Sequence, residues 1–134
     1  MSIGPVSGNG IAVTLPAGKM MFWSVLVQAA YDQFIQLKDS SGNVIFTAQG
    51  SSSSGGTPTA IAQGIFQAVD PTNNYTVWIG TNGGSVWSKV LYSQDAIAIG
   101  SSQYLGKYIF ASEDSTDNDY NDSYLQLQWF EYLG

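Results

Sequence analysis

The sequence contains no cysteine and no histidine, and these two absences exclude several kinds of chemistry. Without cysteine the chain has no thiol nucleophile and no disulfide framework, so its redox compartment is not fixed. Without histidine it has no Ser–His–Asp triad, and without either residue it lacks the usual ligands of zinc. The sequence therefore does not support a triad hydrolase, a cysteine-dependent enzyme or a typical zinc protein.

Charged side chains are also scarce, because they make up only 10% of the 134 residues. Four are lysines and ten are Asp or Glu, which gives a net charge of −6. An acidic protein is repelled by a phosphate backbone, so we expect no nucleic-acid partner.

No segment of the sequence is apolar over the length that crosses a membrane, so we expect no membrane insertion. Residues 1–16 also lack the basic start and the apolar centre of a secretory signal peptide. These features predict cytoplasmic synthesis, and they leave open a non-classical export route to the cell surface or exterior.

Short apolar runs separated by turn signals make up most of the chain. Large apolar residues occupy every second position of residues 11–15, as in a half-buried strand. An Asn-Gly-Gly motif predicts the clearest hairpin, over residues 75–93, and the Gly/Ser-rich residues 49–59 predict an exposed hairpin loop. The sequence therefore predicts an all-β fold, an antiparallel β-sandwich of about nine strands in a single domain over residues 1–134.

One acidic stretch, residues 112–122, carries most of the net charge. Five of the ten acidic residues lie in it, namely Glu113, Asp114, Asp117, Asp119 and Asp122. Its net charge is −5, whereas the rest of the chain has five acids and four bases and a net charge of −1. Carboxylates this close raise one another's pKa, so the stretch is either solvated and disordered or neutralised by a cation.

The residues on both sides of the acidic stretch favour the cation over disorder. Residues 108–111 form a strand-like run, and residues 124–130 place Leu125, Leu127 and Trp129 at alternating positions. The acids are therefore predicted to lie in a loop held between two strands. Such a loop of carboxylate and amide oxygens suits Ca²⁺, which takes six to eight oxygen ligands, although a solvated acidic hairpin loop is the alternative.

The spacing of the acids excludes an EF-hand. An EF-hand beginning at Asp117 needs a glycine at its sixth position and a glutamate at its twelfth, where this chain has Asp122 and Gln128. Five carboxylates are also more than one calcium ion needs. They suit two Ca²⁺ ions about 4 Å apart, because shared carboxylates offset the repulsion between the cations.

The acidic stretch resembles the signature loop of a known family, the two-calcium bacterial lectins of the fucose-binding lectin II type. The matching run reads SEDSTDNDYND and is followed by a strand ending in Trp and a terminal Leu-Gly. Residues 13–17 (Val-Thr-Leu-Pro-Ala) resemble the family's opening strand and turn, and the register continues to residues 28–31. Residues 42–101 match only in general character. The resemblance implies a calcium-dependent lectin, not an enzyme, in which two Ca²⁺ ions per subunit bind adjacent hydroxyls of mannose- or fucose-containing glycans.

Seven positions match the calcium ligands of the family, namely Glu113, Asp117, Asp119, Asn121, Asp122, Gln28 and Gly134. By this resemblance Glu113 and Asp117 would bind the first ion. Asp119 and Asp122 would bridge both ions, and Asn121 would bind the second. Position 28 would contribute its main-chain carbonyl. The terminal carboxylate of Gly134 would reach the site of a neighbouring subunit, which implies a homodimer or a higher oligomer joined through the C-terminus.

The resemblance also implies four sugar-binding positions. Asp114 would accept hydrogen bonds from the sugar, and Ala29, Ala30 and Tyr31 correspond to the specificity loop. Small apolar residues in that loop resemble family members that prefer mannose to fucose. The C-terminal strand is two residues longer than is usual in the family, so Glu131 is an alternative to the terminal carboxylate as a ligand.

Two other functions are compatible with the acidic stretch. In a glycoside hydrolase, Glu113 and Asp117 would flank a glycosidic bond, but bound calcium would keep both ionised, whereas such an enzyme needs one of them protonated. In a structural or adhesion module, calcium would only make the loop rigid, without sugar binding. Release of reducing sugar would identify the enzyme, and tight calcium binding without glycan binding would identify the structural module.

Overall fold

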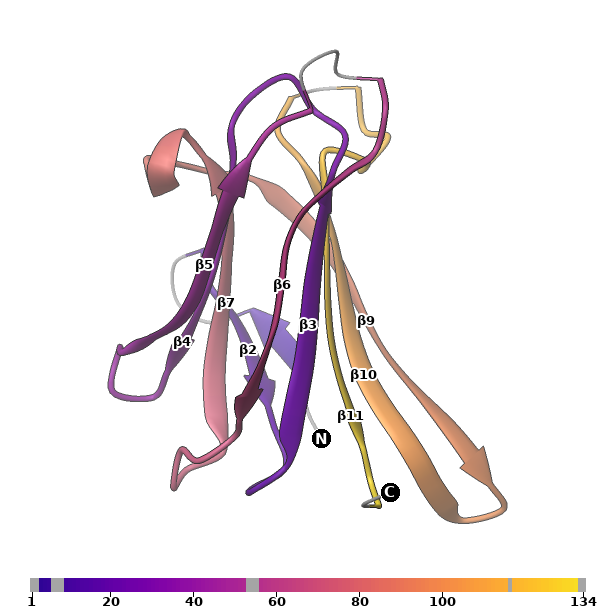
Figure 1. Ribbon diagram of the computed structural model, residues 1–134. Helices are drawn as coiled ribbons and strands as arrows, with labels where there is room; N and C mark the ends of the chain where they lie inside the picture. The colour runs from indigo at the N-terminus through magenta and orange to yellow at the C-terminus, as the bar shows by residue number, and fades with distance from the viewer. Residues whose placement is uncertain (1–2, 6–8, 53–55, 116, 133–134) are drawn as a thin grey trace.

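Two antiparallel β-sheets face each other in the computed structural model, which describes residues 3–5, 9–52, 56–115 and 117–132 (Figure 1). The first sheet contains, in spatial order, β1 (Ile3–Pro5), β2 (Ile11–Thr14), β7 (Asn74–Thr81), β4 (Gln33–Asp39) and β5 (Val44–Gly50), with β8 (Val86–Trp87) paired to β7. The second sheet contains β6 (Thr59–Gln67), β3 (Met20–Val27), β11 (Ser123–Phe130), β10 (Ser102–Glu113) and β9 (Lys89–Ile99). The predicted all-β sandwich is confirmed. The described residues form eleven strands where about nine were expected, and the short β1 and β8 account for the difference.

The core lies between the two sheets because each strand turns every second side chain inward. On β11, Leu125, Leu127 and Trp129 are buried, and the residues between them are only partly buried, as the alternation in the sequence predicts. The two sheets are joined by a ring stack, since Trp23 of β3 lies 3.9 Å from Phe46 of β5, centroid to centroid. The core thus fixes the ends of β10 and β11, between which the acidic residues lie.

The Gly/Ser-rich residues 49–59 do not form the predicted hairpin loop. They connect β5 of the first sheet to β6 at the edge of the second sheet, so the chain changes sheets here. The composition of a loop predicts a turn, but it does not determine which sheet the following strand joins.

The predicted hairpin over residues 75–93 is also wrong for most of its length. After the 3-10 turn η1 (Asn82–Gly84), only the two residues of β8 return along β7. They lie so close to β7 that a Cβ on Gly80 would come within 2.2 Å of the Val86 carbonyl oxygen. The chain then crosses to the second sheet, where β9 pairs with β10.

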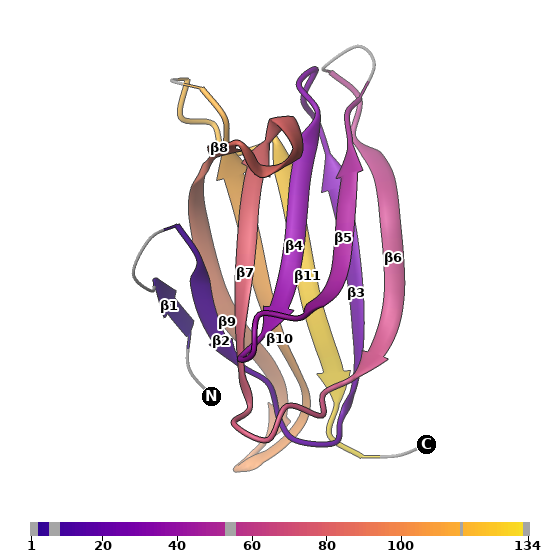
Figure 2. The same ribbon diagram turned by 90° about the vertical axis from the view of Figure 1, so that its left-hand side faces the viewer.

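Three connections gather at one end of the sandwich, as both ribbon views show (Figures 1 and 2). They are the β3–β4 loop (residues 28–32) and the described parts of the β5–β6 connection (residues 51–52 and 56–58) and of the acidic loop between β10 and β11. Residues 28–31 and 112–122, far apart in the sequence, are therefore neighbours in space. The described residues include no helix that is long and apolar enough to cross a membrane.

Candidate metal and sugar site

The acidic loop is anchored at both of its ends. Ser112 of β10 faces Ser123 of β11, and their hydroxyl oxygens lie 2.5 Å apart. The Asp122 N–H donates to the Ser112 carbonyl at 3.1 Å, and the Asp122 carbonyl accepts from the Gln28 N–H at 3.0 Å. The second bond ties the acidic loop to the β3–β4 loop, so the two segments of the predicted site hold each other.

Glu113 lies at the centre of the acidic residues. It is the last residue of β10, and not part of the loop as expected, and it is only 1% exposed. It belongs to two groups of three carboxylates, one with Asp117 and Asp119 and one with Asp114 and Asp122. Within each group, one oxygen from every carboxylate lies within 4.8 Å of the others. The structure thus brings together all five carboxylates that the sequence singles out.

Main-chain groups of the loop orient the Glu113 carboxylate. Its Oε1 accepts from the Ser115 N–H at 3.3 Å, and its Oε2 accepts from the Asp119 N–H at 3.0 Å. The loop curls around Glu113 with two residues in the left-handed region, Asn118 at φ 57° and Tyr120 at φ 52°. A tyrosine there is costly, and such strain is typical of functional loops.

The carboxylates perturb one another's ionisation. Hydrogen bonds from the carboxyls of Asp122 and Asp117, together with main-chain donors, hold the pKa of Glu113 below its ordinary value. The hydrogen bond to Glu113, followed by burial and neighbouring charges, raises the pKa of Asp117 to about 6. Burial, followed by the hydrogen bond to Glu113, raises the pKa of Asp122 to about 7. Because the negative charges repel one another, some of these carboxyls retain protons when no cation is bound. A divalent cation would offset the same repulsion.

No lysine neutralises this cluster in the part of the chain that the structure describes. The one ion pair there joins Lys19 to Glu131, at 3.7 Å between Nζ and Oε1. It lies at the opposite end of the sandwich, where β3 begins and β11 ends (Figure 1). The donor set of the acidic loop is therefore all oxygen and strongly anionic, which suits Ca²⁺.

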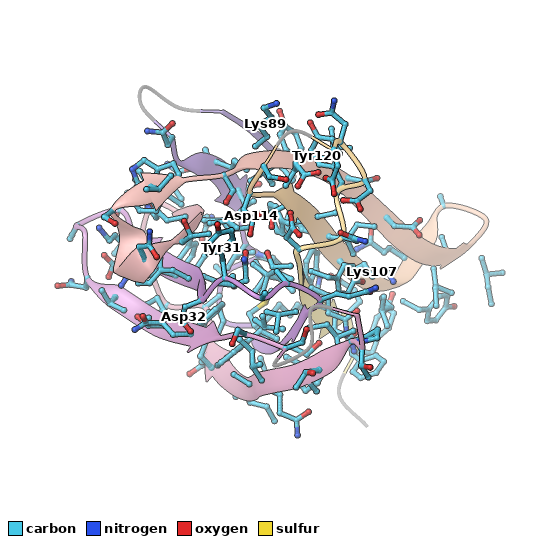
Figure 3. The ribbon with its side chains drawn as sticks, turned by 90° about the horizontal axis from the view of Figure 1, so that it is seen from above. Tyr31, Asp32, Lys89, Lys107, Asp114 and Tyr120 are labelled. Atoms are coloured by element: carbon cyan, nitrogen blue, oxygen red, sulfur yellow. The ribbon has the colours of Figure 1, made fainter. Side chains whose placement is uncertain are left out.

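The predicted sugar-binding residues lie beside the carboxylates. Tyr31 and Asp114 are neighbours when the site is seen from above (Figure 3), and Tyr31 is 66% exposed. Ala30 is exposed as well. Ala29 is instead buried, and its carbonyl accepts from the Ser52 N–H at 2.8 Å.

Three of the predicted metal ligands need separate mention. Asn121 is exposed on the acidic loop, next to Asp122. Gly134 lies outside the described residues, so the structure does not place its carboxylate. Position 28 is half-buried and is held to Asp122 through the main chain, as described above.

The sequence reasoning missed Gln33, the first residue of β4. This side chain is fully buried, and its Nε2 donates to Asp114 Oδ2 at 2.9 Å and to the Tyr31 carbonyl at 3.2 Å. Strand alternation does not predict that this side chain is buried, because Gln33, Phe34 and Ile35 are buried in succession. The signal in the sequence was a polar amide at the start of the predicted strand, two residues after the predicted specificity loop.

Comparison with known proteins gives consistent similarities. Thrombocorticin from Corticium sp. is 27% identical over 119 residues, which cover 86% of this chain and 88% of that protein. The high-affinity mannose-binding lectin of Ralstonia solanacearum has a similar structure (TM-score 0.76, 26% identity), covering 92% of this chain and 96% of that one. The Chromobacterium violaceum lectin CV2L, solved in complex with alpha-methyl-fucoside, is also similar (TM-score 0.72, 26% identity), with the same coverage.

The family model for fucose-binding lectin II (PA-IIL) matches residues 13–131, which include the β3–β4 loop and the whole acidic stretch. This match confirms the resemblance seen in the sequence, and it decides between a lectin and a glycoside hydrolase. The chain belongs to the fucose-binding lectin II family, whose members bind calcium in general, and it is a carbohydrate-binding lectin and not an enzyme.

Proposed function

We propose that the acidic loop binds two Ca²⁺ ions per subunit and that a mannose- or fucose-type monosaccharide binds on the two ions. The observation that carries this proposal is the position of Glu113, which belongs to both groups of carboxylates. Two groups of carboxylates that share one member provide two adjacent positions for a cation, which supports two neighbouring ions better than one. The charges agree, because five carboxylates (−5) and two calcium ions (+4) nearly balance.

The residues present fit this metal pair. Glu113 and Asp117 would hold the first ion, Asp119 and Asp122 would bridge both, and Asn121 would hold the second, with the carbonyl of the residue at position 28. All of these ligands are oxygen atoms, as Ca²⁺ requires. Bound calcium supplies a Lewis acid for neutral sugar hydroxyls.

The protein residues around the ions orient the sugar. Asp114 accepts hydrogen bonds from sugar hydroxyls through its carboxylate, which Gln33 holds in place. Ala30 and Tyr31 form the exposed rim beside Asp114, where the small side chain of Ala30 leaves room for a sugar ring. The lectins of Ralstonia and Chromobacterium, which bind mannose and alpha-methyl-fucoside respectively, support the choice of these two sugars. The alanines favour mannose of the two.

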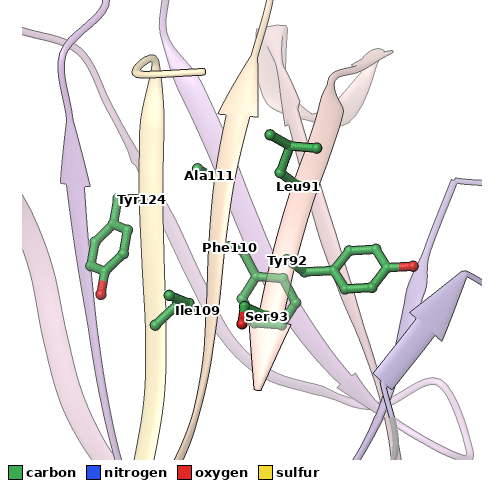
Figure 4. A pocket seen from close by; sticks show the side chains of 7 residues that line it. All are labelled: Leu91, Tyr92, Ser93, Ile109, Phe110, Ala111 and Tyr124. Carbon is green, nitrogen blue, oxygen red and sulfur yellow. The ribbon is translucent and has the colours of Figure 1, made fainter. Parts of the chain in front are cut away.

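A second copy of the chain would complete the site. Large apolar side chains are exposed at the end of β11, where Phe130 and Tyr132 line a hollow of about 410 Å³ together with Met20 of β3. The same sheet carries an apolar hollow of about 170 Å³ between β9, β10 and β11 (Figure 4). Apolar surface of this kind suits a homodimer joined through the C-terminal strand, in which Gly134 reaches the partner's calcium site.

Affinity chromatography combined with metal analysis tests the proposal. The protein should be retained on mannose-agarose in calcium and released by EDTA, and elemental analysis should find two calcium ions per chain. A single ion per chain would contradict the paired site. Two ions without retention on mannose- or fucose-agarose would indicate the structural module instead.

A further inference from the structure

We infer that Gln33 is a positioning residue that sets sugar affinity by holding Asp114 and the main chain of Tyr31 in one fixed arrangement. Gln33 does not itself touch the sugar, because its side chain is fully buried behind the site. The inference rests on the proposed function, since Asp114 and the β3–β4 loop are the proposed sugar contacts.

The side-chain amide of Gln33 uses both of its N–H groups. The Gln33 Nε2 donates one hydrogen bond to Asp114 Oδ2 at 2.9 Å and another to the Tyr31 carbonyl at 3.2 Å. An amide nitrogen has two hydrogens, so these two bonds exhaust its donors. A single NH₂ group therefore ties the acidic loop to the β3–β4 loop.

The orientation of this amide is fixed by its partners. Both partners are acceptors, so turning the amide over would place its oxygen against a carboxylate and a carbonyl. In the observed orientation, the Gln33 Oε1 is buried and has no hydrogen-bond partner among the described residues. An unpaired buried acceptor is unfavourable. An apolar side chain would avoid this cost, but it would donate no hydrogen bond. The two bonds from Nε2 are therefore what a glutamine contributes at this position.

The anchor for these bonds is rigid. Gln33 pairs on one side with Gly50 of β5 and on the other with Thr81 of β7, so it lies within the first sheet. Asp114 follows the last residue of β10 in the second sheet, and its N–H donates to Asp122 Oδ2 at 2.8 Å. The bonds from Gln33 therefore connect the specificity loop, the sugar acceptor Asp114 and the metal ligand Asp122 across the two sheets.

The test compares two glutamines of the same strand. Gln33→Met keeps the length of the side chain and removes both donors, whereas Gln36→Met is the matched control. The Gln36 Nε2 donates to Thr47 Oγ1 of β5 at 3.0 Å, so this side-chain bond goes to a residue outside the site. Isothermal titration measures methyl mannoside and methyl fucoside binding at saturating calcium, and a separate titration measures calcium.

Gln33→Met should weaken sugar binding roughly ten- to hundredfold, because a donor bond to a charged group is lost. Two calcium ions should still bind, with affinity and melting temperature close to those of the parent protein. Gln36→Met should change neither titration. Adding Asp114→Ala to Gln33→Met should weaken sugar binding no further than Asp114→Ala alone, since both changes remove the same interaction. Gln33→Glu is a second variant of the same size, also without donors, and should bind sugar at least as weakly.

Three results would overturn the inference while leaving the proposed function intact. They are parent-like sugar affinity in both Gln33 variants, loss of calcium in step with sugar, or additive effects with Asp114→Ala. Failure of the parent protein to bind either sugar in calcium would instead overturn the proposed function, and the inference with it.

Discussion

Glu113 and Asp114 are adjacent in the chain, yet the structure gives them different environments. Glu113 is buried at the end of β10 among the other acids, whereas Asp114 is partly exposed and is held from behind by Gln33. The roles follow from these positions. Glu113 belongs with the metal ions, and Asp114 presents its carboxylate to a ligand at the surface.

The first prediction separates metal ligands from sugar ligands. Asp119→Ala and Asp122→Ala should each lose both calcium ions, because each carboxylate is proposed to bridge them. Asp114→Ala should keep two ions and bind sugar at least roughly tenfold more weakly, since a charged hydrogen-bond acceptor is lost. Calcium and sugar titrations of the three variants check this. Loss of calcium in Asp114→Ala with retention in Asp119→Ala would contradict the assignment.

The second prediction concerns pH. With the pKa of Asp122 raised to about 7 and that of Asp117 to about 6, both carboxyls carry protons below neutrality that calcium must displace. Calcium affinity should therefore fall as the pH is lowered through 7 and then 6, and it should level off above about pH 8. The pH dependence of stability in the metal-free protein has the opposite direction. Because folding raises the pKa of these two groups, they destabilise the folded state less at lower pH.

Calorimetry in buffers of different ionisation enthalpy measures these protons. Calcium binding at pH 6.5 should release roughly one proton, and at pH 8.5 it should release close to none. Equal calcium enthalpies in all buffers at pH 6.5 would show that the carboxyls are already ionised.

At the scale of elements, the sequence predicts strands better than it predicts their partners. The alternation of Leu125, Leu127 and Trp129 correctly places β11 next to the acidic loop. The strand-like runs on both sides of that loop become β10 and β11, which pair from Ser112 with Ser123 to Leu105 with Phe130. Residues 49–59 and 75–93 were misread because turn residues are chosen by local backbone geometry, whereas a sheet crossing depends on distant contacts. Gln33 was missed for a similar reason, since its charged partner, Asp114, lies 81 residues away in the chain.

The third prediction concerns the C-terminal element. If the Gly134 carboxylate binds the partner's second calcium, a tag added after Gly134 should weaken the binding of that ion and of the sugar. The same tag at the N-terminus is the control, because the first strand, β1, lies at the edge of the other sheet. Light scattering should also find a dimer for the untagged protein. Full sugar affinity and unchanged calcium stoichiometry in the C-terminally tagged protein would show that the terminal carboxylate is not a ligand.

At the scale of the whole molecule, the sandwich has one strongly anionic end and otherwise almost no net charge. The fold gathers five of its ten acids beyond the core, at the ends of β10 and β11. Such a concentration of like charge opposes folding until a cation neutralises it. Metal binding and stability are therefore linked in this protein.

The fourth prediction follows from that link. A calcium ion present at about 100 times its dissociation constant stabilises the folded state by about 2.7 kcal/mol. For a chain of this length, each ion should then raise the melting temperature by roughly 10 °C. Thermal unfolding with excess calcium and with excess EDTA measures the difference. An unchanged melting temperature would contradict a calcium site in the acidic loop.

Calcium-dependent sugar binding is tested most directly by isothermal titration of the protein with methyl mannoside and with methyl fucoside, in calcium and in EDTA. One sugar should bind per chain in calcium, with methyl mannoside the tighter of the two, and neither sugar should bind in EDTA. Sugar binding of equal affinity in EDTA, or no binding of either sugar by a protein that holds two calcium ions, would contradict this prediction.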